Sequence, residues 1–231
     1  MKTAFLIDFL VSKKILVGQL WSTLIVAVCI CLPIGNVYVA LCAVVVTLVI
    51  STGFSLFAYD EQNGWERFRA GFPMSRSEIM WGRLAFIIAL AVASAVFGAV
   101  ACLAISALSP LFAPALGPVF DHAPDAFVVD LPQLVCVITL TIAVVSLMMA
   151  VFIPLIAKFG ITRATRLAPL AFALAFVIMI VAGGESVSLA LDNALLGMGP
   201  LALCAIGLAV TAIICALTGA IAARLYEARE F

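Results

Sequence analysis

The sequence predicts an all-α membrane protein with six transmembrane helices and both termini in the cytoplasm. Of its 231 residues, 66% are hydrophobic and only 10% are charged, whereas about a quarter of the residues in soluble domains are charged. Its apolar runs are close to 20 residues long, which is enough for a helix to cross a hydrocarbon core of about 30 Å. The basic residues also divide unevenly between the two sides that these runs define. We therefore expect one transmembrane domain over residues 1–231.

The predicted spans follow the apolar runs in order. They cover about 15–35, 37–58, 79–108, 131–156, 167–183 and 199–223. The break at 33–36 is short, so the first two helices should form a tight hairpin. The third run is longer than one span needs, and we expect 79–83 to lie at the interface. Pro154 frees a backbone carbonyl near the end of the fourth span and is expected to kink it.

The charges predict the orientation. If both termini share one side, that side also holds loops 59–78 and 158–166. It then carries all twelve basic residues: Lys2, Lys13, Lys14, Arg67, Arg69, Arg76, Arg83, Lys158, Arg163, Arg166, Arg224 and Arg229. The opposite side carries only acids: Asp121, Asp125, Asp130, Glu185 and Asp192. The positive-inside rule places the basic side in the cytoplasm.

The loop predicted on the outer side, 109–130, is rich in proline. Its prolines and the one that follows are Pro110, Pro114, Pro118, Pro124 and Pro132. This spacing is too dense for a continuous helix. We expect a segment that lies on the outer surface or dips slightly into it.

The predicted spans contain almost no ionisable residue in their interior. Such residues mark proton relays, ion paths and catalytic centres in membranes, so their scarcity argues against a proton-coupled transporter, a channel with charged rings and an intramembrane protease. No HExxH motif and no GxxxxGK[ST] loop occurs. We therefore expect no catalytic, cofactor-binding or metal site on this chain, and any ATP must be bound by another chain.

Two other features of the spans have ordinary explanations. Small residues recur at four-residue spacing on the third and sixth spans, which favours close helix packing, with a subunit interface as the alternative. They are Ala91, Ala95 and Ala99; Ser94, Gly98 and Cys102; and Thr211, Cys215, Gly219 and Ala223. All seven cysteines lie in apolar runs and none in an aqueous loop, so we interpret them as small apolar residues with no functional role.

One stretch, 59–83, holds eight of the 24 charged residues. Asp60 and Glu61 end the second span, and residues 65–69 form a short amphipathic segment. Trp65, Phe68 and Phe72 can share one face of it. That face is equally suited to lipid headgroups and to a groove on a protein partner.

The segment is followed by a turn and a helix start. Pro73 stops the amphipathic segment, and Ser75 with Glu78 three residues later forms a capping box in the sequence SRSE. We therefore expect a short helix parallel to the membrane, a proline turn, and a newly capped transmembrane helix.

These residues resemble the small permease subunits of bacterial type 2 ABC exporters, including those that export antimicrobial and cytotoxic peptides. The matching positions are Asp60, Glu61, Trp65, Phe72, Pro73, Met74, Ser75, Arg76 and Ile79. Arg83 stands where these permeases often have a lysine. Residues 5–14 are also similar to the interfacial helix that precedes the first span in the family.

The resemblance implies that 65–78 is a coupling helix that docks into a cytoplasmic ATPase subunit. The implied coupling residues are Trp65, Glu66, Arg67, Phe68, Arg69, Phe72, Pro73, Ser75, Arg76 and Glu78. The resemblance further implies ATP and magnesium on the partner ATPase, a second permease copy or a sibling permease, contact with membrane lipid, no nucleic-acid partner, and a multi-pass location in the bacterial inner membrane.

Two other functions stay open at this point. A six-span substrate-binding subunit of a vitamin importer also depends on a separate ATPase, but it should show polar or aromatic residues converging on an outer pocket. A membrane immunity or assembly protein would need no ATPase. For an exporter, the substrate is expected to be apolar or amphipathic, and a peptide, a lipid and a drug all fit.

Overall fold

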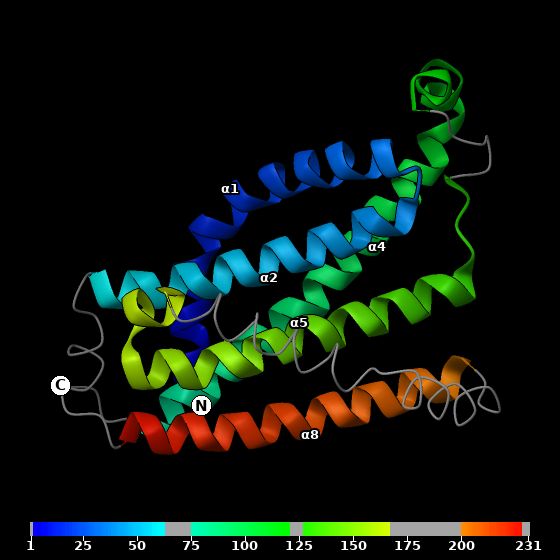
Figure 1. Cartoon of the computed structure of the whole chain (residues 1–231). Helices are drawn as coiled ribbons and strands as arrows, with labels where there is room; N and C mark the ends of the chain where they lie inside the picture. Colours follow the sequence, from blue (N-terminus) through cyan, green and yellow to red (C-terminus); the bar gives the residue numbers. More distant parts are fainter. Residues whose placement is uncertain (1, 63–74, 121–126, 167–199, 228–231) are drawn as a thin grey trace.

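The computed structural model describes residues 2–62, 75–120, 127–166 and 200–227, and its long elements are all α-helices (Figure 1). They are α1 (Lys2–Ile34), α2 (Val37–Gln62), α4 (Arg76–Phe120), α5 (Leu131–Phe159) and α8 (Pro200–Glu227). Five helices within the described ranges are long and apolar enough to cross a membrane. The all-α membrane class is therefore confirmed. The predicted span at 167–183 lies outside the described residues, so the count of six remains a prediction.

The helices run along one bundle with α2 and α4 at its centre. α2 contacts α1, α4 and α5, while α4 also contacts α1 and α8, and α5 packs along α8. In α2 and in α4, about half of the most apolar stretch of the helix is buried inside the bundle. The buried share of the corresponding stretch is much smaller in α1 and α8. Figure 1 shows α5 and α8 beginning at the same end of the bundle and running in the same direction. This direction agrees with the predicted order of spans.

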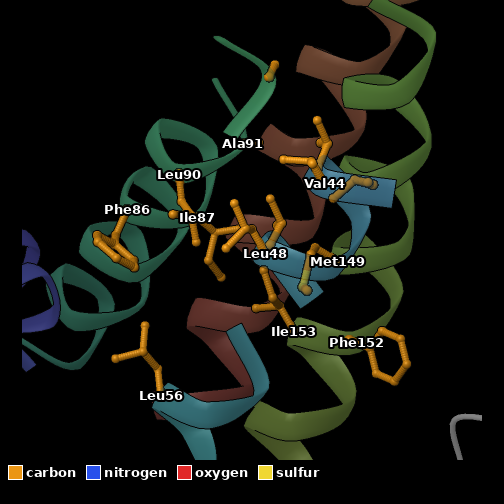
Figure 2. Packing of buried hydrophobic residues seen from close by; sticks show 14 of the residues in the cluster. Val44, Leu48, Leu56, Phe86, Ile87, Leu90, Ala91, Met149, Phe152 and Ile153 are labelled. Atoms are coloured by element: carbon orange, nitrogen blue, oxygen red, sulfur yellow. The ribbon is translucent and has the colours of Figure 1, made fainter. Parts of the chain in front are cut away.

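The core lies between α2, α4 and α5. Figure 2 shows Leu48 of α2, Ile87 of α4 and Ile153 of α5 directed toward a common interior, and all three side chains are buried. Phe54 meets Phe152 edge to face, with ring centroids 4.7 Å apart. Such aromatic pairs add about 0.5–1.5 kcal/mol to the area they bury. These three helices therefore supply most of the apolar core, and Ala27 of α1 and Ala222 of α8 also belong to it.

Small residues let these helices approach closely. A Cβ added to Gly98 of α4 would lie 3.3 Å from the carbonyl oxygen of Leu41 on α2. A Cβ on Gly219 of α8 would lie 2.7 Å from Leu84 Cδ2 and 2.9 Å from Trp81 Cζ3, both of α4. At these two positions the small-residue rows serve packing within the chain, as predicted.

The predicted hairpin between the first two spans is present. Gly35 has φ 65, a conformation that glycine adopts without steric cost, and its N–H donates to Cys31 O at 3.0 Å. The side chain of Asn36 then accepts the N–H of Tyr38 at 2.9 Å. The chain therefore reverses between Ile34 and Val37.

The first part of α1 turns away from the axis of the rest of the helix (dark blue in Figure 1). The resemblance led us to expect an interfacial helix at 5–14 before the first span, and the structure has one continuous helix from Lys2 to Ile34. Deeper in the bundle, α1 is joined to α2 by hydrogen bonds. Gln19 Nε2 donates to Ser51 Oγ at 2.5 Å, and Thr52 Oγ1 donates to Gln19 Oε1 at 2.7 Å.

Two predicted loop boundaries differ from the structure. α4 continues to Phe120, whereas we expected no continuous helix through the prolines after residue 109. The four-residue spacing of Pro110, Pro114 and Pro118 explains this, because proline φ fits a helix and the missing hydrogen bonds all fall along one side. Figure 1 shows the end of α4 turned sharply from the rest of the helix.

The second difference concerns the predicted loop at 158–166. α5 continues past Pro154 to Phe159, and residues 161–166 are again helical. Gly160 separates the two helical stretches with φ 76, and its N–H donates to Ile156 O. The connection between α5 and the helical residues 161–166 is therefore a turn at the single residue Gly160.

Candidate coupling site and buried charge network

The predicted coupling residues divide into two groups. Seven of them, Trp65, Glu66, Arg67, Phe68, Arg69, Phe72 and Pro73, lie outside the described residues, and so does the predicted coupling helix that they form. Ser75, Arg76 and Glu78 are described, and they stand at the start of α4. This start lies at the same end of the bundle as the end of α2 (Figure 1).

The predicted capping box is confirmed. The backbone N–H of Glu78 donates to Ser75 Oγ at 3.2 Å, and the backbone N–H of Ser75 donates to Glu78 Oε2 at 3.2 Å. Two N–H groups that an unprotected helix end would leave without partners are thus satisfied. The start of α4 is therefore fixed by its own first residues.

One turn and a half further along α4, Arg83 forms a buried charge network with two acids. Arg83 Nη2 donates to Asp60 Oδ2 of α2, and Arg83 Nε lies 3.6 Å from Asp8 Oδ2 of α1. The three residues are only 4%, 2% and 0% exposed respectively. The guanidinium carbon of Arg83 also lies 4.5 Å from the centroid of the Phe57 ring. Three helices thus meet at one cation.

Because the three charged side chains are buried, each needs a partner of opposite charge. A buried ion pair that loses one partner leaves an uncompensated charge, which typically costs about 3–5 kcal/mol. The planar guanidinium can address both carboxylates at once because it has five N–H donors in a fixed fork. The network therefore holds α1, α2 and α4 in a defined relative position.

The neighbouring acid, Glu61, makes a second connection. Its carboxylate accepts the backbone N–H of Ile161 and the hydroxyl of Thr162, each at 2.5 Å, and the N–H of Thr162 at 3.3 Å. These N–H groups begin the helical stretch that follows Gly160. Glu61 thus acts as a cap supplied by another helix, and its negative charge suits the positive end of a helix dipole.

Together, Asp60 and Glu61 bond the end of α2 to two other parts of the bundle. Asp60 bonds to α4, and Glu61 bonds to the turn after α5. Because residues 63–74 connect α2 to α4, both flanks of that segment are fastened to the bundle by hydrogen bonds.

Sequence reasoning did not find this network. We placed Arg83 at the interface and treated Asp60 and Glu61 as the acidic end of a span. A signal was present in the sequence, because Asp8 and Arg83 are single charges within otherwise apolar stretches, FLIDFLV and IMWGRLAF. A lone charge of this kind needs a partner of opposite sign.

A cavity of about 290 Å³ lies between α5 and α8. Its lining is Ala143, Val144, Leu147, Gly207, Val210, Thr211 and Ile214. Among these described residues Thr211 alone has a side-chain hydroxyl, and it donates to Gly207 O at 2.7 Å. The cavity therefore offers an apolar surface.

A comparison with protein families gives a match over most of the chain. The family model described as "ABC-2 family transporter protein" matches residues 5–227 of the chain. The match spans all five described helices and includes the buried charge network. No curated protein and no solved structure matches the chain. The protein thus belongs to the ABC-2 transporter family, as a multi-pass membrane permease that is not itself catalytic.

Proposed function

We propose that this chain is the permease subunit of an ATP-driven exporter in the bacterial inner membrane. In this proposal a separate cytoplasmic ATPase binds ATP and magnesium, and the permease moves an apolar or amphipathic substrate outward. The observation that best supports the proposal is the anchoring of both flanks of residues 63–74. The Asp60–Arg83 pair and the Glu61 cap connect this segment to the rest of the bundle.

The proposed contact with the ATPase is made by residues 65–78. Trp65, Phe68 and Phe72 fill a groove on the ATPase, where large aromatic side chains give the greatest binding energy. Arg67, Arg69 and Arg76 face acidic groups on the ATPase or anionic headgroups.

The proposed coupling step is mechanical. When the ATPase subunits close on ATP, they displace the 65–78 segment. The Ser75–Glu78 cap keeps the start of α4 rigid, so the displacement reaches Arg83 and, through Asp60 and Asp8, moves α2 and α1 together. Glu61 passes the same movement to the turn after α5. The working unit in this proposal contains two permeases, either two copies of this chain or this chain with a sibling.

The apolar lining of the bundle supports the proposed class of substrate. None of the described residues that line the cavity between α5 and α8 is charged, and a charged substrate would lose its hydration against them without compensation. A peptide with an apolar face, a lipid and a hydrophobic drug all satisfy this requirement. Of the functions weighed above, only the ABC permease is supported by the family match.

The experiment is co-purification of the chain with its ATPase from membranes. The double variant Trp65→Ala, Arg76→Glu should lose the ATPase while its thermal unfolding stays unchanged. The matched control is Trp21→Ala, Lys14→Glu, which makes the same kinds of change on α1, where Trp21 is 71% exposed. It should retain the ATPase. Equal retention by both variants would exclude the proposed docking segment.

Orientation is tested separately. Cysteines introduced at Ser75 and at Asp125 should react with a membrane-impermeant maleimide from opposite sides of the membrane, with the unaltered chain as background. Labelling of both positions from the same side would overturn the six-span topology.

A further inference from the structure

Two cysteines from different helices lie next to each other near one end of the bundle. Cys136 belongs to α5 and Cys204 to α8, and their sulfur atoms are 3.6 Å apart. They are 68 positions apart in sequence, so helix packing and not local chain geometry brings them together. Both side chains are partly exposed.

The two sulfur atoms are close enough for a small movement to join them in a disulfide. The observed separation is a contact between two sulfur atoms, and a covalent bond requires them to approach to about 2.05 Å. Since α5 and α8 run in the same direction and pack along their length, a rotation of the cysteine side chains can supply this approach without separating the helices.

The position along the helices places the pair near a membrane surface. α5 has 29 residues and α8 has 28, so each is about 42–44 Å long and exceeds the hydrocarbon core by roughly 12–14 Å. Cys136 is the sixth residue of α5 and Cys204 the fifth of α8, so both lie about 6–8 Å from the helix starts. Both sulfurs therefore lie close to the boundary of the hydrocarbon core.

We propose that Cys136 and Cys204 are a redox-active pair that forms an intramolecular disulfide on the outer side of the membrane. This inference uses the orientation adopted in the proposed function, which puts the starts of α5 and α8 outside. Disulfides form and persist in oxidising compartments of this kind. From the sequence we interpreted all seven cysteines as small apolar residues with no functional role. For Cys136 and Cys204 this proposal replaces that interpretation.

The oxidant is a disulfide-bearing thiol reagent or protein, RSSR. One cysteine thiolate attacks a sulfur of RSSR, which forms a mixed disulfide and releases RSH. The second cysteine then attacks the mixed disulfide, closes the Cys136–Cys204 bond and releases the second RSH. Two cysteine thiols lose two electrons and two protons, and RSSR is reduced to two RSH.

The consequence of the bond is a fixed spacing between α5 and α8. Gly207, on the lining of the cavity between these helices, lies three residues after Cys204, and Ala143 lies seven residues after Cys136. The disulfide therefore ties the helices together at the outer end of that cavity and limits how far they can separate there.

The test counts disulfide-bonded thiols in the full chain. Right-side-out membrane vesicles are treated with oxidised glutathione, which does not cross the membrane. Free thiols are then blocked with N-ethylmaleimide in SDS, and the sample is reduced and labelled with a maleimide carrying polyethylene glycol. The wild-type chain should gain two labels. Cys136→Ser and Cys204→Ser should each gain at most one, from a mixed disulfide with glutathione.

The matched control is Cys29→Ser on α1, which removes an exposed cysteine and should still gain two labels. The proposal is overturned if the wild-type chain gains none, or if Cys136→Ser still gains two. Two labels that form only in inside-out vesicles would overturn the outer location of the pair. ATPase co-purification from the same membranes is scored independently, so failure of the disulfide is distinguishable from failure of the proposed exporter function.

Discussion

Two of the contacts between helices α2 and α4 have opposite chemistry. Toward the start of α2, the backbone of Gly98 approaches Leu41, and the neighbouring contacts are apolar. Toward the end of α2, Asp60 meets Arg83, and Asp8 of α1 joins them. The first contact depends on side-chain volume, and the second depends on pairing between charges.

The apolar contact and the charged contact should respond differently when the helices are displaced. An apolar contact weakens gradually, because each methylene contributes independently to the buried area. A buried ion pair has few alternative arrangements, since separating the partners exposes each to an apolar environment. We infer that the charged end moves as one unit and the apolar part adjusts around it. The predictions below test this contrast, beginning with the largest expected effect.

Replacing Arg83 by Met should have the largest effect on stability. Asp8 and Asp60 would each lose their buried contact with the Arg83 guanidinium, and we expect a loss of about 3–5 kcal/mol in the free energy of unfolding. SDS titration followed by tryptophan fluorescence measures this loss. The control is Arg163→Met, since Arg163 is exposed. Equal stability of the two variants would contradict the buried charge network.

Replacing Gly98 by Leu should have the next largest effect. The new side chain would meet the Leu41 backbone, which cannot rotate away, so we expect a loss of about 2–3 kcal/mol from overpacking. Gly18→Leu is the control, because nothing lies within 4 Å of a Cβ at that position. The same titration should show little change for it, and a comparable loss in both variants would refute close α2–α4 packing.

Replacing Glu61 by Gln tests the connection to the turn after α5. Loss of the charge weakens three hydrogen bonds from Ile161 and Thr162, and we expect a loss of about 1.5–2 kcal/mol. Amide hydrogen exchange should become faster at Ile161 and Thr162 in particular. Gln62→Ala, at the adjacent exposed position, should leave exchange at these two amides unchanged.

Replacing Ser75 by Ala should have the smallest effect. It removes the acceptor for the N–H of Glu78, and loss of such a cap costs about 1 kcal/mol. Ser77→Ala makes the same chemical change two residues later and should alter stability by less than about 0.5 kcal/mol. If exchange at the Glu78 amide is equally slow in both variants, the capping box does not hold the start of α4.

Some elements of the fold could be predicted because their cause is local. The hairpin at Gly35–Asn36 and the Ser75–Glu78 cap each depend on a few neighbouring residues, and both are present. The extent of α4 could not be predicted from proline content alone. Three prolines spaced by four residues bend a helix toward one side without ending it, and a rule based on proline density does not distinguish these outcomes.

The sequence by itself determined the class of the protein, because membrane insertion depends on the hydrophobicity of each segment separately. It also determined where the charged segment lies and how α4 begins. Only the tertiary structure paired Arg83 with Asp8 and Asp60, placed Glu61 on the turn after α5, and brought Cys136 beside Cys204. These contacts join residues 23 to 101 positions apart, and such pairs depend on how whole helices pack.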